Sequence, residues 1–438
     1  YTFIIRRSRR KKGTILMEYM TPNFTKDMLK THTILAPNMA PMQFAAIKAA
    51  MESEGYRIVM LENSGAEVSQ LGLKYVHNDT CYPALLIIGQ FLDALNSGKY
   101  DLQHTALLIS QSGGGCRASN YIKLLRKALV KAGYEYIPVA SLNASGLEKG
   151  SSMPMTLRLL LKVLAAAEYG DLIAALHNQV KPYEVNKGDA AACVTKWTAQ
   201  VQDWLNHNKN YTIFSMKRRF KDIANDFAKI PVNRTPKVKV GVVGEIYVKF
   251  SPMGNNDLVS FLESQDCEVN MPGLMGYIEY CVANATLDVQ IYGGPFVKRK
   301  VADLLLAFLD SIGIAMAKAM ESAGFHGPMS FKELMKKPDG ILSLGVKMGE
   351  GWLLTAEMIE LIETGYENIV CAQPFGCLPN HIAGKGVVNR IRAKYPNANI
   401  TAVDYDPSAT KVNQENRIKL MLSVAKERLN QKNNSTTL

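Results

Sequence analysis

The chain has 438 residues, of which 47% are hydrophobic and 21% are charged, and its formal net charge is +12. This composition excludes a disordered or fibrous protein. The length predicts two or three packed units, because a single core stops growing at about 250–300 residues.

A nucleic-acid partner is the first explanation that a basic chain invites, but half of the net charge lies in one short run. Residues 6–12 read RRSRRKK, with six positive charges and no acid. Such a run is typical of a solvated tail, the alternatives being a nuclear or nucleic-acid address or a contact to further sequence. We therefore assign residues 1–30 to a basic tail or linker and expect no nucleic-acid partner. The start at Tyr1 indicates a piece of a longer polypeptide.

Neither a targeting segment nor a membrane span is predicted. The apolar opening Tyr1–Ile5 is too short for a signal-peptide core, and Leu157–Leu176 carries charged residues at four positions. Seven widely spaced cysteines, an odd number, do not form a disulfide framework. We therefore expect a cytoplasmic protein with no membrane association.

Short apolar runs alternate with helical periodicity between residues 31 and 150, which we assign to a first α/β domain. Strands are predicted at 33–37, 57–61, 106–110 and 136–140, with helices beginning at Pro41 and at Ser119. Strands and helices in this alternation are typical of a parallel sheet that is covered by helices.

The strand signal disappears in residues 151–235, where 157–174, 191–205 and 214–227 have helical spacing. A second α/β domain, residues 236–430, begins at a strand over 237–244, and a polar tail follows at 431–438. Its further strands are predicted at 368–372 and 400–404, and its helices at 255–265, 301–323, 355–364, 381–393 and 411–429. The predicted fold is thus α/β, with two Rossmann-like parallel-sheet domains joined by a helical segment.

Common cofactor motifs are absent from the sequence. There is no Gly-x4-Gly-Lys-Ser/Thr loop for phosphate and no His-Glu-x-x-His or paired Cys-x-x-Cys for zinc. Gly384-Lys385-Gly386 lies inside a predicted helix and therefore does not resemble a dinucleotide loop.

Three cysteines lie in turns next to predicted helix N-termini. Cys81 lies in HNDTCYP, Cys116 in QSGGGCR and Cys377 in QPFGCLPNH. A helix N-terminus favours thiolate over thiol, and loops at the carboxyl ends of parallel strands meet in one crevice. Three thiolates from separate loops suit an iron–sulfur cluster with one open coordination position. Small hydrophobic side chains in turns, or a catalytic or redox thiol, are the alternatives.

The remaining cysteines have sequence surroundings that are typical of structural positions. Cys371 lies within an apolar predicted strand and is expected in the core. Cys193, Cys267 and Cys281 lie on amphipathic or strand patterns, and we expect a structural role for each.

The three cysteine motifs together resemble the 2-hydroxyacyl-CoA dehydratase component family. The resemblance is strongest to the dehydratase-like C-terminal region of large fused CoA-substrate-specific enzyme activase proteins. It extends from about Thr31 to Leu422 and includes VVGE at 242–245, GEGW at 349–352 and VDYDP at 403–407.

This resemblance implies that Cys81, Cys116 and Cys377 hold a [4Fe-4S] cluster, or in relatives a double-cubane [8Fe-9S] cluster. It also implies an ATP-dependent activase domain or protein as electron donor, and an acyl-CoA substrate that is dehydrated through a ketyl radical. The chain departs from the plain dehydratases because it is one polypeptide and lacks nucleotide-binding motifs. A double-cubane reductase of a small non-CoA substrate, and a non-catalytic electron-transfer or scaffold module, remain alternatives, and a dimer is left open.

Several polar residues near these motifs are further candidates. Gly114, Gly115 and Arg117 are expected to contact the cluster, although Arg117 could instead face solvent. His381 is a candidate for proton transfer, and its alternative is simply to occupy the first helical turn. Glu245 and Glu350 are candidates for acid–base chemistry or for supporting the residues that contact the cluster. A helix-capping role is expected for Asp404 and Asp406, and a solvated helix face for the basic stretch 217–221, whose alternative role is contact with CoA phosphates.

Overall fold

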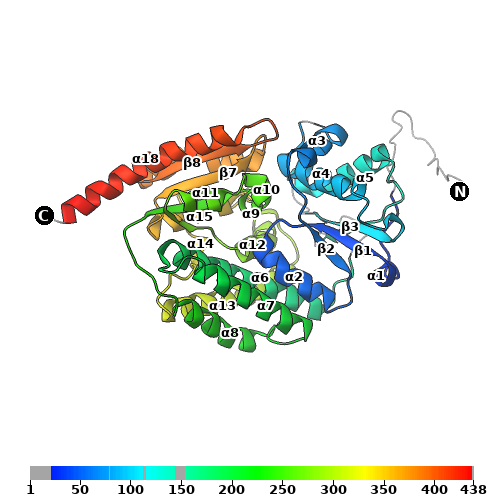
Figure 1. The fold of residues 1–438 in the computed structure, drawn as a ribbon, viewed down its shortest axis with the longest axis horizontal. Coiled ribbons are helices and arrows are strands. Elements are labelled where there is room, and N and C mark those ends of the chain that lie inside the picture. The colour runs from blue at the N-terminus through cyan, green and yellow to red at the C-terminus, as the bar shows by residue number, and fades with distance from the viewer. Residues whose placement is uncertain (1–20, 78, 112–114, 144–152, 437–438) are drawn as a thin grey trace, which may run out of the picture.

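The structure is a computed structural model that describes residues 21–77, 79–111, 115–143 and 153–436. Two four-stranded parallel sheets and a body of long helices make up this part of the chain (Figure 1). The predicted α/β fold with two Rossmann-like sheets is therefore confirmed. The basic run at 6–12 lies outside the described residues.

The first sheet has the strand order β2-β1-β3-β4 and is parallel throughout. Its strands are β1 (Thr33–Pro37), β2 (Ile58–Leu61), β3 (Thr105–Gln111) and β4 (Val139–Asn143). Side chains alternate between its two faces: Leu35 packs toward α4 (Tyr82–Asn96) and α5 (Tyr121–Ala132), and Ile34 toward α2 (Pro41–Glu52). Helix α3 (Ala66–Tyr75) packs on α4 and completes this layer (Figure 1).

The second sheet repeats this connectivity, with the strand order β6-β5-β7-β8. Its parallel strands are β5 (Val238–Gly244), β6 (Cys267–Asn270), β7 (Asn368–Pro374) and β8 (Asn399–Tyr405). One face packs on α9 (Ile246–Phe250), α11 (Leu258–Ser264) and α18 (Lys411–Thr436), and the other on α15 (Trp352–Glu363) and α17 (Val388–Lys394). The shared strand order is a structural repeat that the sequence does not reveal.

A helical body lies beside both sheets. It contains α2 together with α6 (Leu157–Val180), α7 (Asp189–Asn206), α8 (Ile213–Phe227), α12 (Leu274–Tyr292) and α13 (Phe296–Ser322). At its centre the Tyr169 ring lies 5.7 Å from Trp204 and 5.5 Å from Phe220, measured between ring centroids. Because Met316 and Met320 of α13 join the same core, the body includes residues on both sides of the boundary that we placed at 235/236.

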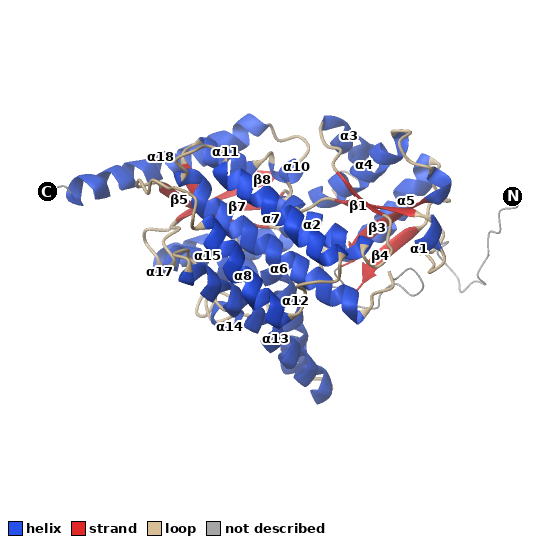
Figure 2. Cartoon of the chain, turned by 60° about the horizontal axis from the view of Figure 1, so that its bottom comes forward, coloured by secondary structure: helices blue, strands red, loops and turns tan. Residues whose placement is uncertain are grey.

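The α12–α13 hairpin projects beyond the rest of the molecule (Figure 2). The shorter helices of the chain are α1 (Met28–Thr31), α10 (Pro252–Asn255), α14 (Phe331–Leu334) and α16 (Leu378–Asn380). Short 3-10 turns occur at Leu102–His104, Arg117–Asn120 and Lys181–Tyr183. Among the described helices, none combines the length and the apolar character that a membrane span requires.

Three predicted elements differ from the structure for local reasons. The strand expected at 136–140 begins only at Val139, because the N–H of Ile137 closes a turn onto the carbonyl of Tyr134. The helix expected at 255–265 is divided by Asn256 and Asp257, both in the left-handed region.

The helix expected at 381–393 is also wrong as a single element. The structure has α16, then a π-helix at His381–Lys385, and then α17. The Gly384 and Gly386 positions favour this break, because glycine has a low helix propensity. A π-helical turn is frequently found at functional sites.

Besides helix α3 and several short helices, two elements were not expected from the sequence. Strand β6 carries Glu268, a buried acid that accepts hydrogen bonds of 2.5 Å from the hydroxyls of both Tyr183 and Tyr366. Because Glu268 interrupts the apolar run by which a buried strand is recognised, the sequence pattern did not indicate a strand here. Helix α12 was the second omission.

Candidate metal centre

The carboxyl ends of the central strands position two of the three predicted cysteines. Cys116 follows β3 and Cys377 follows β7, which occupy the same place in the two sheets. Strand order reverses between β1 and β3 and between β5 and β7, and ligands of open α/β sheets bind at such switch points. Glu245 follows β5, at the switch point of the second sheet.

Each of the three cysteines immediately precedes a helix, as the sequence analysis predicted. Cys81 precedes α4, Cys116 the 3-10 turn Arg117–Asn120, and Cys377 precedes α16. Proline in the first turns of α4 and α16 fixes the backbone there, because its ring holds φ near the helical value.

Polar groups contact each of the three sulfur atoms. The hydroxyl of Tyr121 lies 3.2 Å from the Sγ of Cys81. The amide Nδ2 of Asn380 donates to the Sγ of Cys377 over 3.3 Å. The backbone N–H groups of Ala118 and Arg117 hydrogen-bond the sulfur of Cys116.

Electrostatic interactions connect the three thiols with one another and with the same two carboxyl groups. Cys81 interacts electrostatically with Cys116, and Cys377 interacts with Cys81. Each of the three also interacts with the carboxyl groups of Glu245 and Glu350. The five side chains, from sequence positions far apart, therefore share one electrostatic environment.

The loop at 345–351 closes this region. A Cβ atom at Gly115 would lie 2.5 Å from the sulfur of Met348, and one at Gly349 would lie 3.0 Å from Pro379. The loop thus touches the Cys116 turn on one side and the Cys377 turn on the other. Such close approach is available because glycine has no side chain.

Glu245 and Glu350 are held as a buried pair of carboxyl groups. Glu245 Oε2 accepts from the N–H of Val248 at 2.8 Å, and Glu350 Oε1 accepts from the N–H of Ile246 at 3.1 Å. Asn380 Nδ2 donates to Glu350 Oε2, also at 3.1 Å. Burial, with Glu350 beside it, raises the pKa of Glu245 to about 8, and burial raises the pKa of Glu350.

The thiols do not show the preference for thiolate that the helix N-termini were expected to impose. Burial and the nearby Glu245 raise the pKa of Cys81 to about 12, and burial raises the pKa of Cys116 and of Cys377. That expectation was wrong because the loss of solvent outweighs the local dipoles. A cation bound at these thiols would favour their thiolate forms.

Helix α12 adds residues that sequence reasoning missed. Tyr277 and Tyr280 interact electrostatically with Glu350 and Cys116. Cys281, which we expected to be structural, has an exposed side chain and interacts with Glu350 and with Tyr277. Tyr121 and Asn380 were also missed as site residues, although Asn380 lies within the QPFGCLPNH motif.

The other cysteines lie where the sequence placed them. Cys371 is fully buried in β7. Cys193 is buried in the helical body and Cys267 in the second sheet.

The other residues that the sequence predicted near the cluster differ in their exposure. His381 is half-buried, and its Nδ1 has no hydrogen-bond partner within the described part of the chain. The Arg117 side chain is exposed, and Gly115 lies beside Cys116. Gly114 lies outside the described residues.

The two aspartates and the basic stretch form contacts other than with the thiols. Asp406 Oδ1 accepts from the N–H groups of Ser408 and Ala409 in the turn before α18, whereas Asp404 accepts from Gln373 instead of capping a helix. In the basic stretch of α8, Lys217, Arg218 and Lys221 are exposed, as expected for a solvated face.

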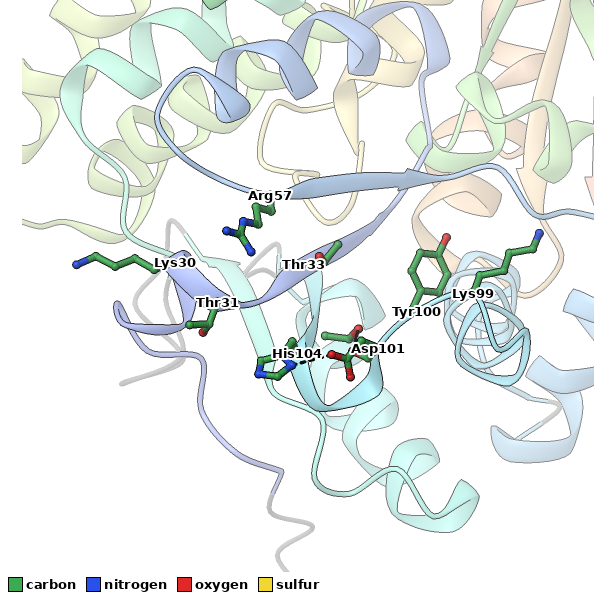
Figure 3. A pocket seen from close by; sticks show the side chains of 9 residues that line it. Lys30, Thr31, Thr33, Arg57, Lys99, Tyr100, Asp101 and His104 are labelled. Atoms are coloured by element: carbon green, nitrogen blue, oxygen red, sulfur yellow. Dashed lines mark hydrogen bonds and ion pairs between the residues drawn. The ribbon is translucent and has the colours of Figure 1, made fainter.

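An open pocket of about 500 Å³ lies at the opposite edge of the first sheet. Lys30, Arg57, Asp101 and His104 line it near the amino ends of β1 and β3 (Figure 3). Because β3 has seven residues at about 3.3 Å each, this pocket is separated from the Cys116 turn by the length of the strand.

The donor set fits an iron–sulfur cluster in kind. Across the described residues, no three His, Cys, Asp or Glu side chains are arranged as they stand to hold a single metal ion. A cluster is larger than one ion and is held by thiolates that need not meet at one atom. Three cysteines from three turns, two of them at strand ends, would supply this kind of donor.

The chain was also compared with known proteins. It matches no protein-family model, and no curated protein is significantly similar to it.

Proposed function

We propose that the chain is the iron–sulfur component of a 2-hydroxyacyl-CoA dehydratase-like system, reduced by an ATP-dependent activase. Cys81, Cys116 and Cys377 would hold the cluster, with [4Fe-4S] as the leading type. The observation that supports the proposal above all is that these three buried or half-buried thiols interact electrostatically with the same two carboxyl groups.

The surrounding residues support a site that orients a reactant and controls protons. Asn380 donates to both the Cys377 sulfur and Glu350, so one amide orients a thiol and a carboxyl group together. Tyr121 holds Cys81 in the same way from the first sheet. Glu245, with its raised pKa, retains a proton at neutral pH and can donate it within the site.

The cofactor would supply redox and Lewis-acid chemistry that these side chains do not provide. When bound, such a cluster provides a low-potential electron and an open iron position for a substrate oxygen. The chain's part is to bind and orient the substrate, to exclude water with the 345–351 loop, and to hold protons at the two carboxyl groups.

Iron and sulfide analysis after anaerobic purification or reconstitution tests the proposal. We expect about four irons per chain for one cubane and about eight for a double cubane. Cys81→Ala, Cys116→Ala and Cys377→Ala should each lower the iron content at least about twofold. Cys193→Ala is the matched control, since that buried cysteine lies in the helical body, and it should retain its iron.

Two results would contradict the proposal. One is the absence of iron from the wild-type protein while the three cysteines are alkylated under native conditions. The other is an equal loss of iron in the control and in the three variants. Circular dichroism establishes in each case that the variant is folded.

The catalytic part of the proposal has its own test. A 2-hydroxyacyl-CoA added to the iron-loaded protein should change the spectrum of the cluster if an iron position is open to substrate. An unchanged spectrum with a series of acyl-CoA compounds would favour an electron-transfer module over a dehydratase.

A further inference from the structure

A cavity of about 160 Å³ lies between the helical body and the second sheet. Helices α6, α12, α13 and α15 contribute to its wall, with the segments around Met271 and Pro328. It is a different feature from the cysteine site, because none of the three cysteines and neither Glu245 nor Glu350 lines it.

Six acidic residues line the cavity. These residues are Glu168, Asp171, Glu279, Asp310, Glu357 and Glu360. Glu357 is paired with Lys249, at 3.0 Å. No ion pair to the other five occurs among the described residues, so the wall carries more acid than base.

Backbone N–H groups satisfy three of these five acids. Asp171 accepts from Leu274 and Met275, Asp310 from Phe331, and Glu360 from Met329. These contacts give the three acids a structural role in fixing the loops around the cavity.

Glu168 is different, because one of its carboxyl oxygens is buried and has no partner in the part of the chain that the structure describes. The residue is 2% exposed, and its Oε2 has no hydrogen-bond partner within the described residues. Asp171 and Glu279 are its electrostatic neighbours, and both are acidic. A buried oxygen in this situation is costly unless a donor binds to it.

The shape and lining of the cavity indicate the kind of donor. Met275, Met316 and Met320 form apolar parts of the wall, so the space suits a ligand with both a cationic and an aliphatic part. A cavity of about 150 Å³ accommodates about six non-hydrogen atoms. The acids around it are not grouped to hold a metal ion in the part of the chain that the structure describes.

We propose that this cavity binds a small aliphatic ammonium compound, such as a short alkyl diamine, whose ammonium groups contact Glu168 and Glu279. The ammonium ion supplies the missing hydrogen-bond donor and neutralises the excess acid, while the alkyl part packs against the methionines. In its absence burial raises the pKa of Glu168 and, to about 8, that of Glu279, so that protons take the place of the cation.

Calorimetric titration with 1,4-diaminobutane at pH 8 tests this site, and 1,4-butanediol serves as the neutral ligand of the same length. We expect a dissociation constant below about 1 mM for the diamine and at least tenfold weaker binding of the diol. The titration needs no iron, so its result is independent of the cluster proposal.

Two variants and one control locate the binding. Glu168→Gln should weaken diamine binding at least about tenfold, because it removes the charge and keeps the shape. Gly313→Leu should abolish binding by filling the space; a Cβ atom there would meet nothing within 4 Å. Glu67→Gln, on an exposed position of α3, should bind as the wild type does.

Each of the following results would overturn the proposal. They are absence of diamine binding to the wild type, equal affinity for the diol, and unchanged affinity in either Glu168→Gln or Gly313→Leu. Because the two variants act through charge and through volume, failure of one to fold leaves the other as a complete test.

Discussion

Lys249 and Glu357 form an ion pair in the interior of the second domain. The ammonium Nζ lies 3.0 and 3.2 Å from the two carboxylate oxygens, and each side chain is 4% exposed. The pair connects α9, the helix that Glu245 begins, to α15 on the other side of the second sheet. It therefore supports the backbone on which the candidate metal centre is built.

Lys249→Met should destabilise the protein by about 3–5 kcal/mol, because Glu357 is then left buried without its counter-ion. The entropy of unfolding is about 2.1 cal/mol/K per residue, so a chain of 438 residues has about 0.9 kcal/mol/K. The unfolding midpoint should fall by about 3–5 °C if the chain unfolds as one unit. A larger fall is expected if the second domain unfolds separately.

Thermal unfolding of the wild type, Lys249→Met, Glu357→Leu and the double variant measures this effect. The double variant should recover most of the loss, because two apolar side chains replace a buried pair at little net cost. The deficit of Lys249→Met should also shrink toward pH 5, where protonation of Glu357 costs less. If the double variant loses the sum of the two single losses, the reasoning is refuted.

Two other substitutions test the burial of Glu279 in the acidic cavity and the backbone conformation of Gly351 in the loop near the cysteines. In the wild type, Glu279 has a pKa raised to about 8, so between about pH 5 and 8 the folded chain keeps a proton that the unfolded chain has lost. Stability should therefore fall with rising pH, and Glu279→Gln should remove part of this slope in thermal unfolding; parallel profiles would contradict this. Gly351→Ala should cost at least about 1–3 kcal/mol, because Gly351 has φ +43° and a Cβ would collide with the carbonyl of Val346. Gly313→Ala, in open space on α13, is the control and should leave the unfolding midpoint unchanged or raise it slightly; equal midpoints for the two would count against this account.

The positions of the three cysteines were predictable because they depend on local chemistry. Proline two residues later marks Cys81 and Cys377 as turn residues ahead of helices, and glycine before with an apolar strand upstream marks Cys116 and Cys377. The parallel sheets were predictable for the same reason, since buried strands are apolar throughout their length. Glu245 was recognised from its place after the β5 strand.

Only the tertiary structure showed which distant residues surround the cysteines. Asn380 contacts both Glu350 and Cys377, and Met348 reaches Gly115 from more than 200 positions away, contacts that no local pattern encodes. The pKa of the thiols was misjudged because it depends on burial, a property of the packed molecule and not of the helix end.

The sequence by itself thus determined the element types, the two sheets and the turns that carry the cysteines, because these follow from hydrophobic period, proline and glycine within a few residues. The tertiary structure decided that two sheets of identical strand order face the helical body, and that acids from four helices enclose one cavity. Those outcomes depend on side chains that meet only after the chain has folded, where burial sets the charge and the hydrogen bonds of each group.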